Sequence, residues 1–285
     1  MYLRDTEESL TRIGPTTPMG ELLRRFWVPA LLENEVGHTN APPVKLRLFG
    51  EDLIVFRDVH GRVAIAPAYP TVVRGGVVWT YMGPQDFLPQ LPDFAWSYAP
   101  EARRYANKRA AAGNWALALE STMDAPHLPI SDVKDVEYGL LIGARTTRDD
   151  RTDEWRITQF LLPFYTIVPP PEACEDPQDE PFHGFACVPI DDDNTWVWSF
   201  GANPLRDWTP AERAVQATAG DGVHATESAE RSEHGVADFR HLMVKLAREN
   251  ARGHVPEAAQ HGSWYAVRSA TLHVERGVPF DTASH

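Results

Sequence analysis

Residues 114–127 have the sequence Asn-Trp-Ala-Leu-Ala-Leu-Glu-Ser-Thr-Met-Asp-Ala-Pro-His, and the predicted fold and the predicted site both start from this segment. Residues 114–124 favour a helix, which the prolines that follow must end. In that helix Glu120, Asp124 and His127 would share one face, because they are spaced at i, i+4 and i+7.

A metal site is one interpretation of this spacing. His127 and Asp132 lie on the irregular segment after the helix, where a neutral imidazole and a carboxylate can share a divalent metal. Nearby acids such as Glu120 can orient the histidine through hydrogen bonds. A surface helix with two acidic residues and a histidine at its end explains the same pattern, so both interpretations stay open.

The sequence on either side of this segment predicts two regions. Before it, apolar or alternating runs predict the strands of a small antiparallel β unit, at residues 44–49, 53–56, 63–65 and 76–81. Residues 84–100, rich in proline and aromatic residues, are predicted to be a linker. After it, we expect strands at 155–162 and 194–200 and an amphipathic helix at 236–250. This pattern predicts a β domain at residues 1–88 and a second domain at 89–285.

Composition excludes several functional classes. The chain has 285 residues, 43% of them hydrophobic and 24% charged, which is typical of a globular protein. With 40 acidic and 27 basic residues its net charge is −13, which argues against general nucleic-acid binding. No apolar run is long enough to cross a membrane, and the polar start does not resemble a signal peptide, so we expect a cytoplasmic protein.

Nine stretches of the chain carry a family resemblance, and they follow one another in the family's order: residues 10–20, 25–30, 50–57, 69–79, 114–127, 163–166, 188–192, 194–200 and 276–279. On these stretches the chain resembles the catalytic subunits of Rieske-type non-haem iron ring-hydroxylating oxygenases, within the phthalate 4,5-dioxygenase-like branch. The resemblance implies an α+β fold with a helix-grip catalytic domain, in which a curved antiparallel sheet surrounds a long helix. The β unit at residues 1–88 would then be a reduced Rieske domain.

The segment that binds the Rieske cluster is missing from this resemblance. The family carries a Cys-x-His and a Cys-x-x-His pair before its Tyr-Pro-Thr-Val motif, whereas here residues 63–67 run directly into Ala68-Tyr-Pro-Thr71. Neither pair occurs in the chain, and its two cysteines, Cys174 and Cys187, lie far downstream. Because a Rieske cluster needs two thiolates and two imidazoles, we expect no iron–sulfur cluster in this chain.

The mononuclear iron site that the resemblance implies is also altered. The family motif is Asp-x-x-His-x-x-x-x-His, in which both histidines bind iron. Asp124 and His127 match its first two positions, but the third falls on Asp132. The alternative is that the metal site has decayed and that Asp132 is a solvent-exposed replacement.

The family's last ligand is a carboxylate near a C-terminal helix, and residues 220–228 lie where it is expected. Asp221 is the first choice and Glu227 the second, and His224 could substitute as a nitrogen ligand. A site of His127, Asp132 and Asp221 would be richer in oxygen than the usual iron triad. It would bind Fe(II) more weakly and admit manganese, magnesium or calcium more readily.

Three functions follow from these expectations, and the resemblance favours an oxidoreductase. The first is an oxygenase component that hydroxylates or dealkylates a small aromatic or heteroaromatic compound, with electrons from a separate Rieske or ferredoxin-type protein. Asp124 would orient His127 and relay electrons, Glu120 would line the site, and the chain would form a homotrimer or hetero-oligomer. The alternatives are a non-catalytic subunit that assembles with a cluster-bearing homologue, and a hydrolase or lyase that reuses the same pocket.

Overall fold

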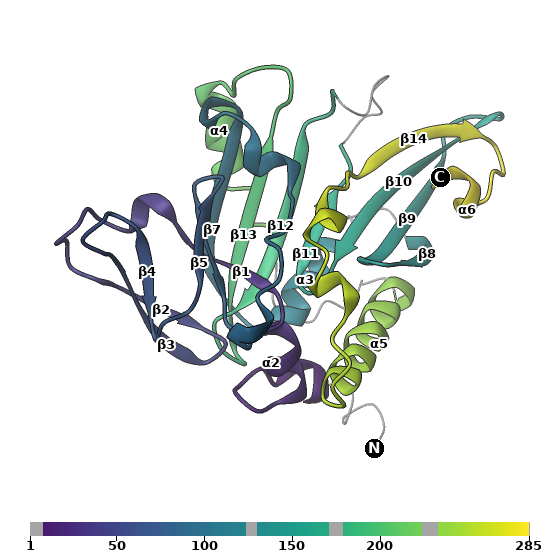
Figure 1. Cartoon of the computed structure of the whole chain (residues 1–285). Coiled ribbons are helices and arrows are strands. Elements are labelled where there is room, and N and C mark those ends of the chain that lie inside the picture. Colours follow the sequence, from purple (N-terminus) through teal and green to yellow (C-terminus); the bar gives the residue numbers. More distant parts are fainter. Residues whose placement is uncertain (1–7, 124–129, 171–178, 224–232, 285) are drawn as a thin grey trace.

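The structure is a computed structural model, and it describes residues 8–123, 130–170, 179–223 and 233–284 (Figure 1). Its N-terminal part begins with helix α2 (Pro18–Leu23), whose first turn is capped by the Thr17 hydroxyl. Within the described residues, two small antiparallel sheets follow. One has the order β1-β6-β5 and contains β1 (Trp27–Leu32), β5 (Thr71–Arg74) and β6 (Val77–Tyr81). The other has the order β2-β3-β4 and contains β2 (Val44–Leu48), β3 (Glu51–Arg57) and β4 (Val63–Ala66). The four strands predicted here are confirmed, but they are divided between two sheets, and β1 and β5 were not predicted.

A larger antiparallel sheet follows, and it has eight strands among the described residues. Its order is β7-β13-β12-β11-β10-β9-β8, with β14 paired to the first half of β10. The strands are β7 (Arg104–Ala112), β8 (Ile130–Val136), β9 (Gly139–Thr147), β10 (Thr152–Leu161), β11 (Tyr165–Val168), β12 (Phe182–Pro189), β13 (Asn194–Ala202) and β14 (Ala270–Glu275). Of the described strands, β7 and β8 are the outermost, so they mark opposite edges of this large sheet.

Helices cover one face of the large sheet. Helix α3 (Trp115–Met123) packs on β11, β12 and β13, while α5 (Glu233–Asn250) packs on β8, α2 and α3 (Figure 1). Two shorter helices are α4 (Pro210–Ala217), beside β7, and α6 (Phe280–Ala283), near the C-terminus. The helices predicted at 114–124 and 236–250 are confirmed, and so is the α+β class with a large antiparallel sheet.

Successive side chains of a strand point to opposite faces, which gives the large sheet a helix face and a β-unit face. The helix face is fixed by Phe160, which stacks edge-on against Phe239 of α5, and by Thr166, which donates a hydrogen bond to Thr122 of α3. By strand alternation and register, the same face carries Tyr105, Asn107, Arg109, Arg156, Thr158 and His183.

The β-unit face packs against the N-terminal part of the chain. Tyr165 donates a buried hydrogen bond to the carbonyl oxygen of Trp27 at 2.8 Å. Lys108 forms a 2.9 Å ion pair with Glu35 and lies over the ring of Trp196, with 4.6 Å between the ammonium and the ring centroid. The N-terminal part is thus attached to this face by apolar packing and by at least two polar anchors.

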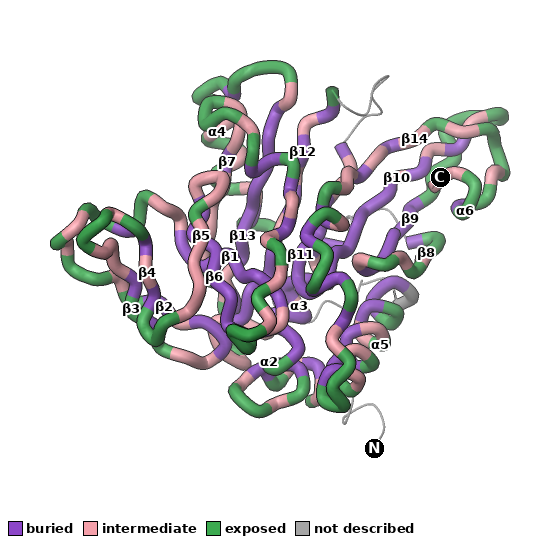
Figure 2. Tube along the Cα trace, viewed as in Figure 1, coloured by how far each residue is buried: buried purple, intermediate pink, exposed green. Residues whose placement is uncertain are grey.

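The apolar core is continuous between the two predicted domains. One cluster of buried side chains includes residues from Leu10 to Tyr265. Figure 2 shows that buried residues occur in both parts of the chain. Residues 84–100 are not a free linker, because Phe94 and Trp96 are buried against Tyr165 and Phe200 on the β-unit face. The division of the chain at residue 88, into a reduced Rieske domain and a catalytic-type domain, therefore stays a prediction.

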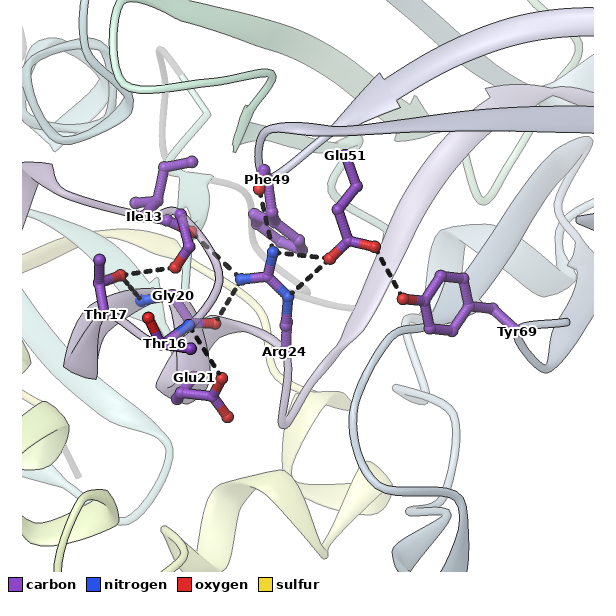
Figure 3. A network of polar contacts seen from close by, with 10 residues as sticks. Ile13, Thr16, Thr17, Gly20, Glu21, Arg24, Phe49, Glu51 and Tyr69 are labelled. Atoms are coloured by element: carbon purple, nitrogen blue, oxygen red, sulfur yellow. Dashed lines mark hydrogen bonds and ion pairs between the residues drawn. The ribbon is translucent and has the colours of Figure 1, made fainter. Parts of the chain in front are cut away.

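Arg24 fixes the N-terminal segment to the small sheets (Figure 3). Its buried guanidinium donates hydrogen bonds to the carbonyl oxygens of Ile13 and Phe49, at 3.1 and 2.9 Å. It also forms a 2.9 Å ion pair with Glu51, whose second oxygen accepts a hydrogen bond from Tyr69. One arginine thus joins three segments that are distant in sequence.

None of the helices in the described ranges combines the length and the apolar character of a transmembrane span.

Candidate functional site

The predicted site begins at the C-terminal end of α3. Asp124 and His127 lie in 124–129, outside the described residues. The chain is described up to Met123 and again from Ile130, the first residue of β8. The Ile130 side chain packs closely against Gly235 at the start of α5. A methyl group added at Gly235 would lie only 2.6 Å from Cδ1 of Ile130. In sequence, the segment that carries Asp124 and His127 lies between α3 and β8, and the first residue of β8 lies against the first turn of α5.

Glu120 joins α3 to α5. Its carboxylate is fully buried and forms a bidentate ion pair with Arg240, with Nε–Oε1 and Nη2–Oε2 distances of 2.6 and 2.9 Å. Such a fork-to-carboxylate pair is both strong and directional. Glu120 was expected to line the site, and the structure shows it joined to Arg240, where it holds α3 to α5.

Asp132 lies on β8, and its side chain points away from α3 and α5. Lys134 and Val136, two and four residues later on the same strand, share its face. Lys134 forms an ion pair with Asp281 of α6, and Val136 packs on the small apolar cluster around Phe280. Asp132 is therefore an exposed residue on the β-unit face, opposite to the face that α3 and α5 cover.

Asp221 lies at the other edge of the large sheet. Its carboxylate is 64% exposed and approaches the Arg109 guanidinium of β7, with 3.5 Å between Oδ1 and Nε. Arg109 also donates hydrogen bonds to the carbonyl oxygens of Gly220 and Val223, so it fixes the turn that contains Asp221. Asp132 belongs to β8 at the opposite edge, and the structure does not bring these two carboxylates together.

The described residues alone do not complete a metal site. In the described ranges, no three His, Cys, Asp or Glu side chains form a group that could hold a metal ion. The predicted ligand His127 and the alternatives Glu227 and His224 lie outside these ranges. The ligand set therefore stays a prediction.

The helix face also carries a partly buried histidine that the sequence did not single out as functional. The Tyr105 hydroxyl lies 2.9 Å from Nδ1 of His183, and Trp208 packs against both rings. Burial lowers the pKa of the His183 imidazole below its ordinary value of 6.5. A hydrogen-bonded neutral histidine is thus part of this face.

Cys187 and Arg156 are two further side chains on this part of the sheet. Cys187 is a buried free thiol whose pKa is raised by burial, which fits the structural role expected of it, and Cys174 lies outside the described residues. Arg156 lies on the helix face of β10. The strand predicted at 155–162 already implied this orientation, because alternate residues of a strand share a face and Arg156 alternates with Thr158 and Phe160.

The chain is similar in sequence to oxygenase subunits, although no protein-family model matches it. It is 27% identical over 249 residues to the phthalate 4,5-dioxygenase oxygenase subunit of Pseudomonas putida, a match that covers 56% of this chain and 57% of that protein. It is 24% identical over 280 residues to the 3-chlorobenzoate-3,4-dioxygenase oxygenase subunit of Comamonas testosteroni, covering 70% and 63%. The chain thus spans less than two thirds of the length of these relatives.

Solved structures share the fold. Dicamba monooxygenase bound to dicamba superposes with a TM-score of 0.57 at 14% identity, over 81% of this chain and 99% of that one. The oxygenase of carbazole 1,9a-dioxygenase, solved in complex with its ferredoxin, superposes with a TM-score of 0.50 at 14% identity, over 93% and 96%. At this identity the similarity establishes the fold, which confirms the expected α+β architecture.

Proposed function

We propose that this chain, whose homologues are Rieske-type ring-hydroxylating oxygenase subunits, is an oxygenase component that hydroxylates or dealkylates a small aromatic or heteroaromatic compound. The observation that carries the proposal is the similarity to two dioxygenase oxygenase subunits, one of them matched over 70% of this chain. The shared fold supports it.

In this proposal a mononuclear iron is held beside the end of α3. Iron bound by two histidines and a carboxylate is a common means of activating oxygen in proteins. His127 would be one ligand, and Asp124 would orient it. The sequence predicted Asp132 and Asp221 as the other ligands, but their positions at opposite edges of the large sheet favour Glu227 or His224, the alternatives within residues 220–228.

Electrons would come from a separate protein. Neither of the two cysteines belongs to a Cys-x-His or Cys-x-x-His pair, the pairs that hold a Rieske cluster in the family, so the proposal assigns no such cluster to this chain. We propose that a Rieske or ferredoxin-type partner docks on a homotrimer or hetero-oligomer of this chain. The carbazole oxygenase, which shares the fold, was solved together with a ferredoxin.

Product analysis under isotopically labelled oxygen tests the proposed reaction. The full chain is loaded with Fe(II) and supplied with a reduced ferredoxin, phthalate or 3-chlorobenzoate, and ¹⁸O₂. We expect labelled product from the wild type, none from His127→Ala, and unchanged product from His60→Ala, whose side chain is exposed in the turn between β3 and β4. Product that forms without oxygen would contradict the proposal and favour a hydrolase or lyase.

One observation favours a non-catalytic subunit as the second candidate. Glu120 is engaged by Arg240, and Asp132 points to the β-unit face, so neither is available to a metal at the end of α3. A subunit of this kind would form a stable complex with a cluster-bearing homologue, and His127→Ala would leave both the complex and its activity unchanged. Loss of activity in that complex would exclude this candidate.

A further inference from the structure

We propose that the free edge of strand β7 binds an extended acidic segment of a partner protein, which adds to the large sheet as a further strand. The inference goes beyond the proposed function and does not depend on it. It follows from the backbone groups along this edge, from the groove beside them and from the charges that line the groove.

The edge of β7 presents backbone groups that no described residue pairs. β7 pairs with β13 without a break in register, and Asn203 donates a 2.8 Å backbone hydrogen bond to the carbonyl oxygen of Arg103. In an antiparallel pair, alternate residues turn both their N–H and C=O groups to the partner strand, so those of Ala106 and Lys108 point outward. Within the described ranges, these outward groups have no hydrogen-bond partner. Such an edge is a template for a further strand.

Arg104 shows how the same edge is satisfied where the chain itself reaches it. Its outward N–H donates a 3.1 Å hydrogen bond to the carbonyl oxygen of Pro100. Its outward carbonyl oxygen accepts a 3.4 Å hydrogen bond from Arg213 of α4. These two bonds confirm the outward direction, and the next outward residue, Ala106, lines an open groove instead.

The groove beside this part of β7 has a volume of about 530 Å³. Ala106 and Asn107 line it from the strand, while Asn34, Arg57 and Gly76 line it from the N-terminal part. Helix α4 lies beside the same strand (Figure 1). Because folded elements border the groove, it suits a single extended segment better than the broad face of a folded domain.

The groove carries more positive than negative charge, although the whole chain has a net charge of −13. Of its arginines, Arg57 is paired with Glu33 at 3.5 Å. The guanidinium groups of Arg104 and Arg213 hydrogen-bond to backbone carbonyl oxygens, and neither forms an ion pair with a described carboxylate. The other acidic lining residue, Glu101, is exposed. Two cations thus face one carboxylate, which favours an acidic ligand.

Charge also argues against a second copy of this chain as the occupant. β7 has the sequence Arg-Tyr-Ala-Asn-Lys-Arg-Ala-Ala-Ala, with three basic residues and no acidic one. Pairing β7 with its own copy would bring these like charges together, which destabilises a strand pair. A segment with acidic residues at alternate positions would instead turn its carboxylates to the β-unit face, where Arg104 lies. In strand addition, main-chain hydrogen bonds supply affinity and the side chains supply specificity.

Fluorescence anisotropy of labelled peptides with the full chain tests the proposal. The probe is a short peptide of alternating glutamate and threonine, and its counterpart has lysine in place of glutamate. We expect the wild type to bind the glutamate peptide more tightly by about tenfold or more. N-methylation of one alternate set of amides in this peptide should abolish binding, because those amides pair with β7, and methylation of the other set should not.

Substitutions along the edge locate the site. Ala106→Pro removes an outward N–H and leaves the ladder to β13 intact, so it should weaken binding of the glutamate peptide by about tenfold or more. Ala112→Pro is the matched control, because Ala112 is an outward residue at the other end of β7 and lies outside the groove. Asn34→Glu, at an exposed residue of the groove, should weaken binding by about threefold or more, whereas His60→Glu, outside it, should not.

Several results would overturn the assignment. They are a wild type that binds the two peptides equally or binds neither, and a folded Ala106→Pro variant that binds like the wild type. Where circular dichroism shows that Ala106→Pro is unfolded, the methylated peptides decide, and equal binding of both methylated forms would refute strand addition. A wild-type oligomer that Ala106→Pro dissociates in sedimentation would show that a second copy covers the edge. Because these measurements need no iron, oxygen or substrate, they are separate from the test of oxygenase activity.

Discussion

The role of the Glu120 carboxylate is set by its partner, Arg240. Glu120 is fully buried, and Arg240 reaches it from α5. Removing the arginine would take the bidentate ion-pair partner away from a carboxylate in the core. We predict that Arg240→Met lowers the free energy of unfolding by about 3 kcal/mol, as is typical when one member of a buried pair is lost.

Denaturant unfolding measures this loss, and an exposed arginine on the same helix provides the control. Arg248→Met, in the last turn of α5, should change the free energy of unfolding by less than about 0.5 kcal/mol. Equal stability of the two variants would show that the Glu120–Arg240 pair does not hold α3 to α5.

His183 makes stability depend on pH. Burial lowers the pKa of its imidazole below 6.5, so between that lowered pKa and pH 6.5 the folded chain binds fewer protons than the unfolded chain. The free energy of unfolding therefore falls as the pH is lowered through this window. We predict that His183→Gln reduces the difference in unfolding free energy between about pH 5 and about pH 7.5. His60→Gln, at an exposed histidine, should leave it unchanged, and an identical pH dependence in wild type and His183→Gln would refute the assignment.

At the scale of elements, the spacing of apolar residues predicted those helices and strands whose own sequence carries a clear apolar pattern. The helices at 114–124 and 236–250 and four of the N-terminal strands, β2, β3, β4 and β6, are where apolar spacing places them, whereas β1 and β5 were not predicted. Strand β8 could not be predicted in this way, because Asp132, Lys134 and Asp135 make it too polar for an alternation of apolar residues to stand out. The direction of the Asp132 side chain follows only from the pairing of β8 with β9, so a spacing of five residues from His127 could not show it.

Arg24 gives an element-scale prediction, because α2, the β2–β3 turn and Tyr69 all depend on it. Lysine keeps the charge but has no fork to reach the carbonyl oxygens of Ile13 and Phe49 together with Glu51. We predict that Arg24→Lys lowers the free energy of unfolding by about 2 kcal/mol. The melting temperature should fall by several degrees.

Arg12 supplies the comparison for this variant. Its side chain is 63% exposed and its ion pairs with Glu8 and Asp192 are long, at 3.8 and 3.6 Å. Arg12→Lys should therefore melt within about 1 °C of the wild type. A melting temperature of Arg24→Lys that matches that of Arg12→Lys would show that the network in Figure 3 contributes little.

At the scale of the whole molecule, the two predicted domains share one core. Phe94, Tyr165 and Tyr265 pack together under the N-terminal sheets, and the Tyr165 hydroxyl bonds to the backbone of Trp27. We predict that a fragment of residues 89–285 expressed alone fails to unfold cooperatively, because its β-unit face would be exposed to water. Circular dichroism during heating measures this, and a sharp transition in the fragment would establish 89–285 as an independent domain.

The whole-molecule function depends on whether this chain holds iron through His127. Iron content after anaerobic loading with Fe(II) and desalting measures this directly, on the wild type, His127→Ala and Asp221→Asn. We expect about one iron per chain in the wild type, a loss of most of it in His127→Ala, and retention in Asp221→Asn, because that carboxylate lies with Arg109 at the far edge of the sheet. Equal iron in wild type and His127→Ala, or none in either, would show that His127 does not hold a metal.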